Sequence, residues 1–339
     1  MASSGLSTVA IAALAALVLQ NAFNFIVMRV ARITAPQVVP GTVVLASEIF
    51  KLVGAGVLAC VLEGKTIASL IASIRHNIFG DVRQMLKLAV PAALYVVQNN
   101  ALLVASGALD AGTVQVLSQM KVLTTALAAA VVLGTRYSKP QLAALALLFV
   151  GGVTVQSHAL AAKPVKSVAN DQQASLSPML GLLAVLVAVA CSGSAGVWFE
   201  RMLKREGGGA GVWERNVHMA LLSIPITGMA AFTSAEHRAT VMQAGLFGGW
   251  NYWVVASVLL SAGGGLLVAL VVKHTSNIAK SFATGISTVL TSVISVVFLG
   301  TQLGWEFPLG ALLILLGSGL YGTAPKPAAK PLLSPERKG

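Results

Sequence analysis

The sequence predicts an all-α protein that crosses a membrane several times. Of its 339 residues, 56% are hydrophobic and only 10% are charged, and the mean hydropathy is +0.82. Soluble domains carry about 25% charged residues, so this chain has too few polar side chains to cover a water-facing surface. Its apolar residues also fall into runs of the length that one membrane helix needs, roughly 20 residues.

Ten such runs are present, and each is expected to form one spanning helix. Pro, Gly and charged residues separate them, as is typical of loops. The expected helices cover residues 6–28, 37–62, 84–106, 109–133, 140–158, 178–203, 212–233, 250–272, 277–299 and 305–323. A polar linker loop at 161–177 divides them into a first half, 1–160, and a second half, 178–323, and the Pro- and Lys-rich tail at 324–339 is expected to be disordered.

The positions of the basic residues predict that both termini lie in the cytoplasm. With the N-terminus inside, 16 of the 23 Lys and Arg residues fall on the inner side and five on the outer side. Such an excess is typical of cytoplasmic loops. The net charge of +12 therefore indicates topology. It does not indicate nucleic-acid binding, because the basic residues are scattered singly and form no basic patch with aromatic residues.

A short internal match suggests that the two halves are related. Leu133–Thr135 recurs as Leu299–Thr301, an offset of 166 residues, and at the same offset Gly151 meets Gly317. Two halves of five helices each would form an inverted repeat, since an odd number of spans makes the second half enter from the opposite side. Short matches between apolar helices also arise by chance, and the sequence leaves both explanations open.

Polar residues inside the expected spans are the candidates for a binding site. An ionisable group at membrane depth is costly and marks a substrate path. Lys121 has no obvious acidic neighbour in its own span, so its expected partner is a bound anion, with Glu48 of another span as the alternative. Lys280 stands near a helix start, where backbone amides favour anions, although a snorkelling role at the membrane surface is also open.

Glu48 and Lys51 are three residues apart and can pair on one helix face. That pair would either neutralise two charges within the membrane or act as a gate. Gln98 and Asn99 would contact a ligand or link helices. No catalytic constellation is present, because the P-loop-like segment at 64–66 lacks its first glycine and no His or Cys has metal-ligand spacing. Neither a metal nor a cofactor is expected.

Several motifs occur in one order along the chain: Val97–Asn100, Leu109–Ala111, Gln115–Lys121, Cys191–Gly193, Ala195–Val197, Phe199–Glu200, Arg215–Asn216, Val272–Lys273 and Asn277–Lys280. Together they resemble the nucleotide-sugar transporters, in the branch that carries CMP-sialic acid, UDP-galactose and UDP-N-acetylglucosamine. The resemblance spans about residues 10 to 322. It implies the ten-helix drug/metabolite transporter fold of two inverted five-helix repeats, usually in the Golgi membrane. It also implies exchange of a cytosolic nucleotide sugar for a luminal nucleoside monophosphate.

The resemblance also implies roles for individual residues. Lys121 and Lys280 match the lysines that contact phosphate, and Gln98 and Asn99 match contacts to base or ribose. The whole expected binding site comprises Gln98, Asn99, Gln115, Ser118, Lys121, Ser192, Gly193, Asn216 and Lys280. Three tyrosines of the family pattern are replaced here by Val114, Ser118 and Ala220, which leaves the preferred base and sugar open.

The sequence therefore predicts an antiporter for a UDP-sugar or CMP-sialic acid, and not an enzyme. One alternative on the same fold is a carrier of another phosphorylated metabolite. Another is a membrane scaffold for a glycosyltransferase that transports nothing. A homodimer or an association with a glycosyltransferase is a further expectation.

Overall fold

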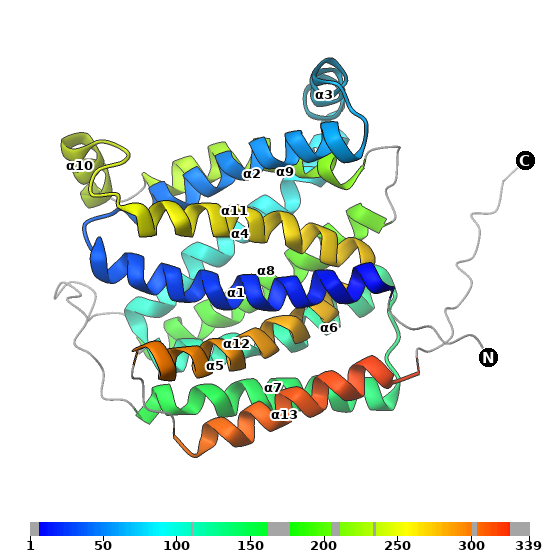
Figure 1. Cartoon of the computed structure of the whole chain (residues 1–339), viewed down its shortest axis with the longest axis vertical. Coiled ribbons are helices and arrows are strands. Elements are labelled where there is room, and N and C mark those ends of the chain that lie inside the picture. The colour runs from blue at the N-terminus through cyan, green and yellow to red at the C-terminus, as the bar shows by residue number, and fades with distance from the viewer. Residues whose placement is uncertain are drawn as a thin grey trace, which may run out of the picture.

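Long helices that run side by side make up most of the structure (Figure 1). The structure is a computed model and describes residues 7–109, 111–161, 177–204, 211–232, 235–299 and 304–325. Its helices are α1 (Thr8–Thr34), α2 (Pro40–Leu62), α3 (Ile67–Ile74), the π-helical turn η1 (Arg75–Gly80), α4 (Val82–Ala108), α5 (Ala111–Leu117), the 3₁₀ turn η2 (Ser118–Met120), α6 (Lys121–Leu133), α7 (Lys139–Ala161), α8 (Pro178–Lys204), α9 (Val212–Ala231), α10 (Ala235–Ala244), α11 (Tyr252–His274), α12 (Asn277–Leu299) and α13 (Glu306–Thr323).

Each expected helix has a counterpart, and the expected span 109–133 is built from α5, η2 and α6. The largest difference is at the end of α1, which continues six residues beyond the expected end at residue 28. Arginines end the apolar run there, but they do not end the helix. The helix stops where Ala35 precedes Pro36, because proline disfavours helical dihedrals in the residue before it. The short helices α3, η1 and α10 were not expected.

Eight of the described helical segments are long and apolar enough to cross a membrane. They confirm a helical protein with several membrane passes. The remaining two expected spans, α4 and α9, have 27 and 20 residues but carry more polar side chains and are not among the eight. The linker residues 162–176 and the tail residues 326–339 lie outside the described part of the chain, as do Gly300 and Thr301 of the internal match.

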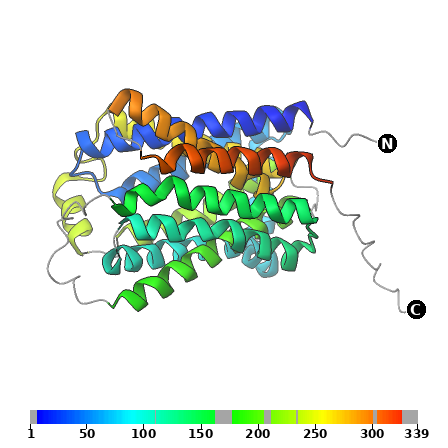
Figure 2. The same ribbon diagram turned by 90° about the horizontal axis from the view of Figure 1, so that it is seen from below.

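Helices from the two halves of the sequence alternate in space. α1 packs on α11 and α12, α4 packs on α8, and α7 packs on α13. Figure 2 shows α7 and α13 lying side by side along one face. α1 begins and α13 ends at the same end of the bundle, which we call the termini end (Figures 1 and 2).

Glycines let α7 and α13 approach closely. A Cβ atom added to Gly151 would lie 2.8 Å from the carbonyl oxygen of Gly310, and one added to Gly317 would lie 2.9 Å from the carbonyl oxygen of Ala144. Real side chains do not fit at such distances, so these positions need glycine. Small residues at contacts of this kind bring the backbones of membrane helices together.

Candidate functional site

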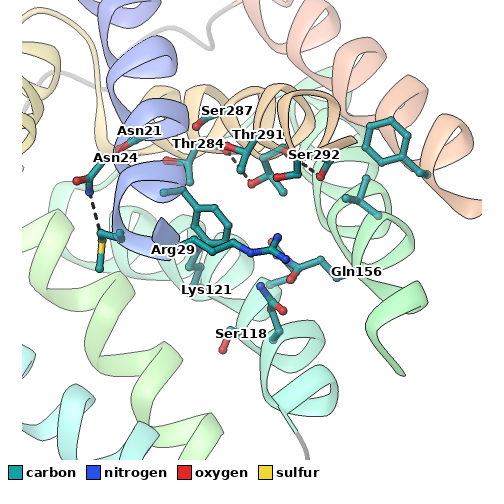
Figure 3. A pocket seen from close by; sticks show the side chains of 18 of the residues that line it. Asn21, Asn24, Arg29, Ser118, Lys121, Gln156, Thr284, Ser287, Thr291 and Ser292 are labelled. Atoms are coloured by element: carbon teal, nitrogen blue, oxygen red, sulfur yellow. Dashed lines mark hydrogen bonds between the residues drawn. The ribbon is translucent and has the colours of Figure 1, made fainter. Parts of the chain in front are cut away.

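A cavity of about 800 Å³ opens between helices of both halves (Figure 3). α1 and α12 each contribute one face, and the remainder comes from α5, η2, α6, α7 and the start of α13. The described lining residues are Asn21, Asn24, Phe25, Met28, Arg29, Gln115, Ser118, Gln119, Lys121, Val155, Gln156, Thr284, Ser287, Thr288, Thr291, Ser292, Ser295, Gly304 and Phe307. The helical spacing of three and four residues puts the α1 set, and likewise the α12 set, on a single side of its helix.

The cavity lies in the half of the bundle away from the termini end. α1 contributes only residues from its second half, beginning at Asn21. Gln156 belongs to the last turns of α7, and Phe307 to the first turn of α13. All of these segments point away from the end where α1 begins and α13 finishes.

Apolar packing closes the bundle on the side of the termini end. The cluster consists of Val122, Ala126, Ala129, Ala144, Leu145, Leu148, Val197, Ile278, Phe282 and Ile314, and Tyr137 and Tyr321 pack against it. The rings of Phe282 and Tyr321 stack with centroids 4.6 Å apart, and the hydroxyl of Tyr137 donates to the carbonyl oxygen of Ala126 at 3.0 Å. We call this set the plug. The plug therefore lies between the cavity and the termini end.

The cavity is positively charged. Its described lining contains two cationic side chains, Arg29 and Lys121, and no Asp or Glu. Lys280 stands one residue before Ser281, which lines a small cavity together with Lys121. A low-dielectric cleft lined by charge of one sign concentrates ligands of the opposite sign. The site is therefore suited to an anion.

Hydroxyl groups from α12 form a polar wall in the cavity. Ser287, Thr291 and Ser295 repeat every four residues and are only 4%, 8% and 6% exposed. None of the hydrogen bonds found among the described residues involves these three hydroxyls. Their oxygens are not among the fully buried side-chain atoms without a partner, so they are accessible from the cavity. A ligand rich in hydroxyl groups would supply the missing partners.

Three residues of the site predicted from the sequence line the cavity: Gln115, Ser118 and Lys121. A second, much smaller cavity of about 30 Å³ joins Lys121 to Ser281, Thr284 and Gly285. Lys280 is next to Ser281 in this first part of α12. The structure therefore brings the two predicted phosphate lysines to the same region, although Lys280 does not line the large cavity.

Four other predicted site residues are not among the described residues that line the cavity: Gln98, Ser192, Gly193 and Asn216. Gly193 is at the contact between α8 and α6, where an added Cβ would lie 2.7 Å from the backbone nitrogen of Thr125. Ser192 is its neighbour on α8. The side chain of Asn216 is buried and donates to the carbonyl oxygen of Val212 at 2.9 Å. Gln98 on α4 has a buried Oε1 without a hydrogen-bond partner. The side chain of Asn99 lies outside the described part of the structure.

Glu48 and Lys51 form an ion pair on α2. The Lys51 Nζ lies 2.6 Å from each carboxylate oxygen, and the two side chains are less than one-fifth exposed. Lys51 also packs against α11, since a Cβ on Gly265 would lie 2.9 Å from its Cδ. Neither residue lines the cavity.

The sequence analysis did not identify the cavity-lining residues of α1, or the cavity-lining Ser and Thr residues of α12. The spacing of the Ser and Thr residues from Thr284 to Ser295 was a signal that could have revealed the α12 face. Arg29 was counted as a charge outside the membrane because it ends an apolar run. Gln156 stands alone in its span and has no pattern that would mark it.

A family model described as nucleotide-sugar transporter matches residues 6–322. The chain belongs to the nucleotide-sugar transporter family. The match confirms the family that the sequence motifs indicated. Members of this family are transporters and not enzymes.

Named relatives extend over most of this transporter. The UDP-galactose translocator of Mus musculus is 36% identical over 327 residues, which cover 96% of this chain and 81% of the relative. The UDP-N-acetylglucosamine transporter of Rattus norvegicus is 34% identical over 321 residues, which cover 93% of this chain and 95% of the relative. The Caenorhabditis elegans UDP-galactose/UDP-N-acetylglucosamine transporter srf-3 is 36% identical over 265 residues, 78% of this chain and 68% of the relative.

A solved protein crystal structure shares the fold of this transporter. It superposes with a TM-score of 0.56 at 12% sequence identity, and the match covers 91% of this chain and 96% of the solved chain. At that identity the likeness concerns the arrangement of helices only.

Proposed function

We propose that this nucleotide-sugar transporter is an antiporter that exchanges a pyrimidine nucleotide sugar for a nucleoside monophosphate. The observation that carries the proposal is a cavity with two cations, a hydroxyl-rich wall and no acidic residue in its described lining. A nucleotide sugar combines a phosphate anion with a sugar rich in hydroxyl groups. The names of the mouse and rat relatives favour UDP-galactose or UDP-N-acetylglucosamine, with CMP-sialic acid as the next candidate.

Lys121 is the proposed contact for the phosphate that both exchanged ligands carry. It lies in the cavity, and Lys280 stands one residue before Ser281, which shares the small cavity with Lys121. Two ammonium groups at membrane depth are costly, and a phosphate that binds between or beside them neutralises their charge. The loaded carrier then moves easily, while the empty carrier moves slowly with unpaired cations. Exchange is therefore obligatory in this mechanism.

Alternating access requires two states that open on opposite sides, and an inverted repeat would supply them. Two features of the contact between α7 and α13 support such a repeat. Gly151 faces Gly310, and Gly317 faces Ala144. Adding 166 to the residue numbers turns 144 into 310 and 151 into 317, so the shift exchanges one contact for the other.

The wider helix contacts obey the same exchange. If α1, α2, α4, α5–α6 and α7 correspond to α8, α9, α11, α12 and α13, then the contact of α4 with α8 becomes that of α11 with α1. The contact of α6 with α8 likewise becomes that of α12 with α1, and both members of each pair occur. These relations favour ten spans, with α4 and α9 included, over a chance match of apolar helices.

We place the transporter in the Golgi membrane with both termini in the cytoplasm. The excess of Lys and Arg on the side of the termini supports this orientation. The cavity then faces the lumen and the plug faces the cytosol. Delivery of the sugar to a luminal glycosyltransferase, or pairing with a second copy, would fit this placement.

Uptake into proteoliposomes tests the proposal. The purified protein is reconstituted into vesicles preloaded with UMP, CMP or GMP, and uptake of radiolabelled UDP-galactose, UDP-N-acetylglucosamine and CMP-sialic acid is measured. Uptake of a UDP-sugar that depends on internal UMP is the expected result. Uptake of CMP-sialic acid driven by CMP would keep the mechanism and change the base. No exchange with any pair, in folded protein, would overturn the proposal.

One observation favours a second candidate function, the transport of another phosphorylated metabolite. Ser118 lines the cavity where the family pattern has a tyrosine, so an aromatic face that could hold a base is missing there. A carrier of another phosphorylated metabolite would use the same cations without a base. It would ignore internal UMP, CMP and GMP, and it would still show a thermal shift with its own ligand, unlike a scaffold that transports nothing.

A further inference from the structure

Arg29 is a cation in the cavity that the proposed mechanism does not use. It comes from α1, whereas Lys121 comes from α6. Figure 3 shows its side chain reaching across the cavity toward Gln156. Among the described residues, no hydrogen bond or ion pair involves Arg29. Arg29 is an exposed residue, and its guanidinium carries five N–H donors that a ligand can engage in place of water.

Gln156 is a second unpartnered group at the same place. It belongs to α7, it is 9% exposed, and its Oε1 has no hydrogen-bond partner. Leaving a buried amide unsatisfied costs free energy, so such a group is expected to meet a partner in some state of the protein. The amide can rotate to present its NH₂ group, because the two ends have nearly the same shape. It can therefore donate to the same acceptor as Arg29.

Arg29 and Gln156 line the large cavity together with Lys121. The small cavity that joins Lys121 to Ser281 and Thr284 contains neither of them. The two cations of the large cavity therefore belong to different helices and have different neighbours. One ligand with two anionic groups, or two successive positions of one anion, would engage both.

We propose that Arg29 and Gln156 form a second oxyanion subsite in the transport cavity, distinct from the one at Lys121. The inference rests on the proposed function and deepens it. A planar guanidinium binds a carboxylate or phosphate through two parallel hydrogen bonds, which a lysine ammonium cannot match. The oxyanion is either a phosphate oxygen of the nucleotide or the carboxylate of an acidic sugar.

The main alternative is that Arg29 only anchors the end of α1 at the membrane surface. Long basic side chains often extend toward water in this way. The chain offers an internal control, since Arg32 lies three residues further along α1, is also exposed and does not line the cavity. An anchoring role would make the two arginines equivalent, whereas a subsite would make only Arg29 sensitive to the ligand.

The test is equilibrium binding to the purified full-length protein by calorimetry. Wild type, Arg29→Ala, Arg29→Lys, Gln156→Leu and Arg32→Ala are compared with UMP, UDP-glucose and UDP-glucuronate as ligands. Thermal unfolding of each variant without ligand verifies the fold. We expect Arg29→Ala to weaken binding about tenfold or more, because a hydrogen bond to a charged group is lost. Arg29→Lys restores only part of the affinity, and Gln156→Leu weakens the same ligands less.

The ligands distinguish the two sources of the oxyanion. An equal loss for all three assigns the subsite to phosphate, and a loss confined to UDP-glucuronate assigns it to a sugar carboxylate. Unchanged affinities in Arg29→Ala, or an equal loss in Arg32→Ala, would refute the subsite while leaving the proposed function intact. Wild type that binds neither these three ligands nor CMP and CMP-sialic acid would refute both.

Discussion

The carboxylate of Glu200 accepts a hydrogen bond from the backbone N–H of Asn277 at a distance of 2.8 Å, where α12 begins. Glu200 also binds the ammonium of Lys204 at 2.8 Å on its own helix, α8. An acidic group at a helix start is favoured by the helix dipole and satisfies an N–H that has no partner within the helix. The contact joins the two helices close to the plug.

Replacing Glu200 should therefore loosen the plug. The Glu200→Ala variant leaves the Asn277 N–H unsatisfied in a buried position and removes the partner of Lys204. We expect it to lower the free energy of unfolding by about 1–3 kcal/mol. The midpoint of thermal unfolding in detergent measures this. Glu306→Ala is the control, since Glu306 stands in the first turn of α13 and its buried Oε2 has no hydrogen-bond partner. Equal losses in both variants would contradict a specific role for the Glu200 contact.

Lys121 and Lys280 should both be required for exchange. The Lys121→Ala and Lys280→Ala variants are expected to lower the rate of nucleotide-sugar exchange at least about tenfold, because a charge-assisted contact to phosphate is lost. Exchange in proteoliposomes measures the effect. Lys273→Ala, which removes an exposed lysine at the end of α11, should exchange normally. A normal rate in either of the first two variants would remove that lysine from the mechanism.

The α12 hydroxyls should matter for the sugar and not for the monophosphate. The Thr291→Val variant keeps the shape of the side chain and removes the hydroxyl of a residue that is 8% exposed and lines the cavity. We expect weaker binding of the nucleotide sugar by about two- to tenfold, and unchanged binding of UMP. Calorimetry with both ligands measures this. Thr323→Val, at the end of α13, provides a matched change outside the cavity. If Thr291→Val weakened the binding of both ligands equally, Thr291 would not contact the sugar specifically.

Gly151 should tolerate no larger residue. In Gly151→Val the Cβ would fall 2.8 Å from the Gly310 carbonyl oxygen and 2.9 Å from Ile314, which forces α7 and α13 apart. Overpacking of this kind lowers the free energy of unfolding by about 1–3 kcal/mol. The thermal midpoint of Gly319→Ala is the control, since nothing lies within 4 Å of a Cβ at that position. An unchanged midpoint in Gly151→Val would mean that the two helices are not held as closely as their glycines indicate.

Lys65 should make stability depend on alkaline pH. Its Nζ lies 2.8 Å from Glu214, and this partner raises the pKa of Lys65 above its ordinary value of 10.5. A raised pKa stabilises the folded state fully below pH 10.5, and that stabilisation disappears as the pH rises through the folded-state value. The side chain is 30% exposed, so the effect is small.

Thermal unfolding of wild type and Lys65→Met at a series of pH values measures how stability depends on the charge of Lys65. The difference between their thermal midpoints should be constant from pH 7 to about pH 10 and shrink above pH 10.5. A difference that is unchanged up to pH 12 would mean that Lys65 acts through packing of its side chain rather than its charge.

Much of the fold could be predicted because membrane helices are encoded locally. The ends of α8, α12 and α13 lie within one residue of the expected ends, since the apolar runs there stop at Gly, Pro or charged residues. α1 was misjudged because a charged residue can remain helical at a membrane surface. α3 and α10 were missed because 8 and 10 residues form no span.

The candidate site was predicted only in part. Lys121 could be identified because a cation in an apolar run is rare and costly wherever the helix packs. Gln156 could not, because an isolated amide gives no sign of the neighbour that it faces. Gly193 was predicted as a ligand contact from its motif, and the structure adds a close approach to Thr125 that the motif did not indicate.

Sequence alone specified a helical membrane transporter, its helices and the cation at position 121, because hydrophobic length and buried charge are properties of single segments. Only the folded structure revealed that Arg29 and Gln156 share a cavity with the α12 hydroxyls. These residues come from helices that are far apart in the chain. Which face of each helix meets the others depends on how α7 packs on α13 and α1 on α12, and no single segment carries that information.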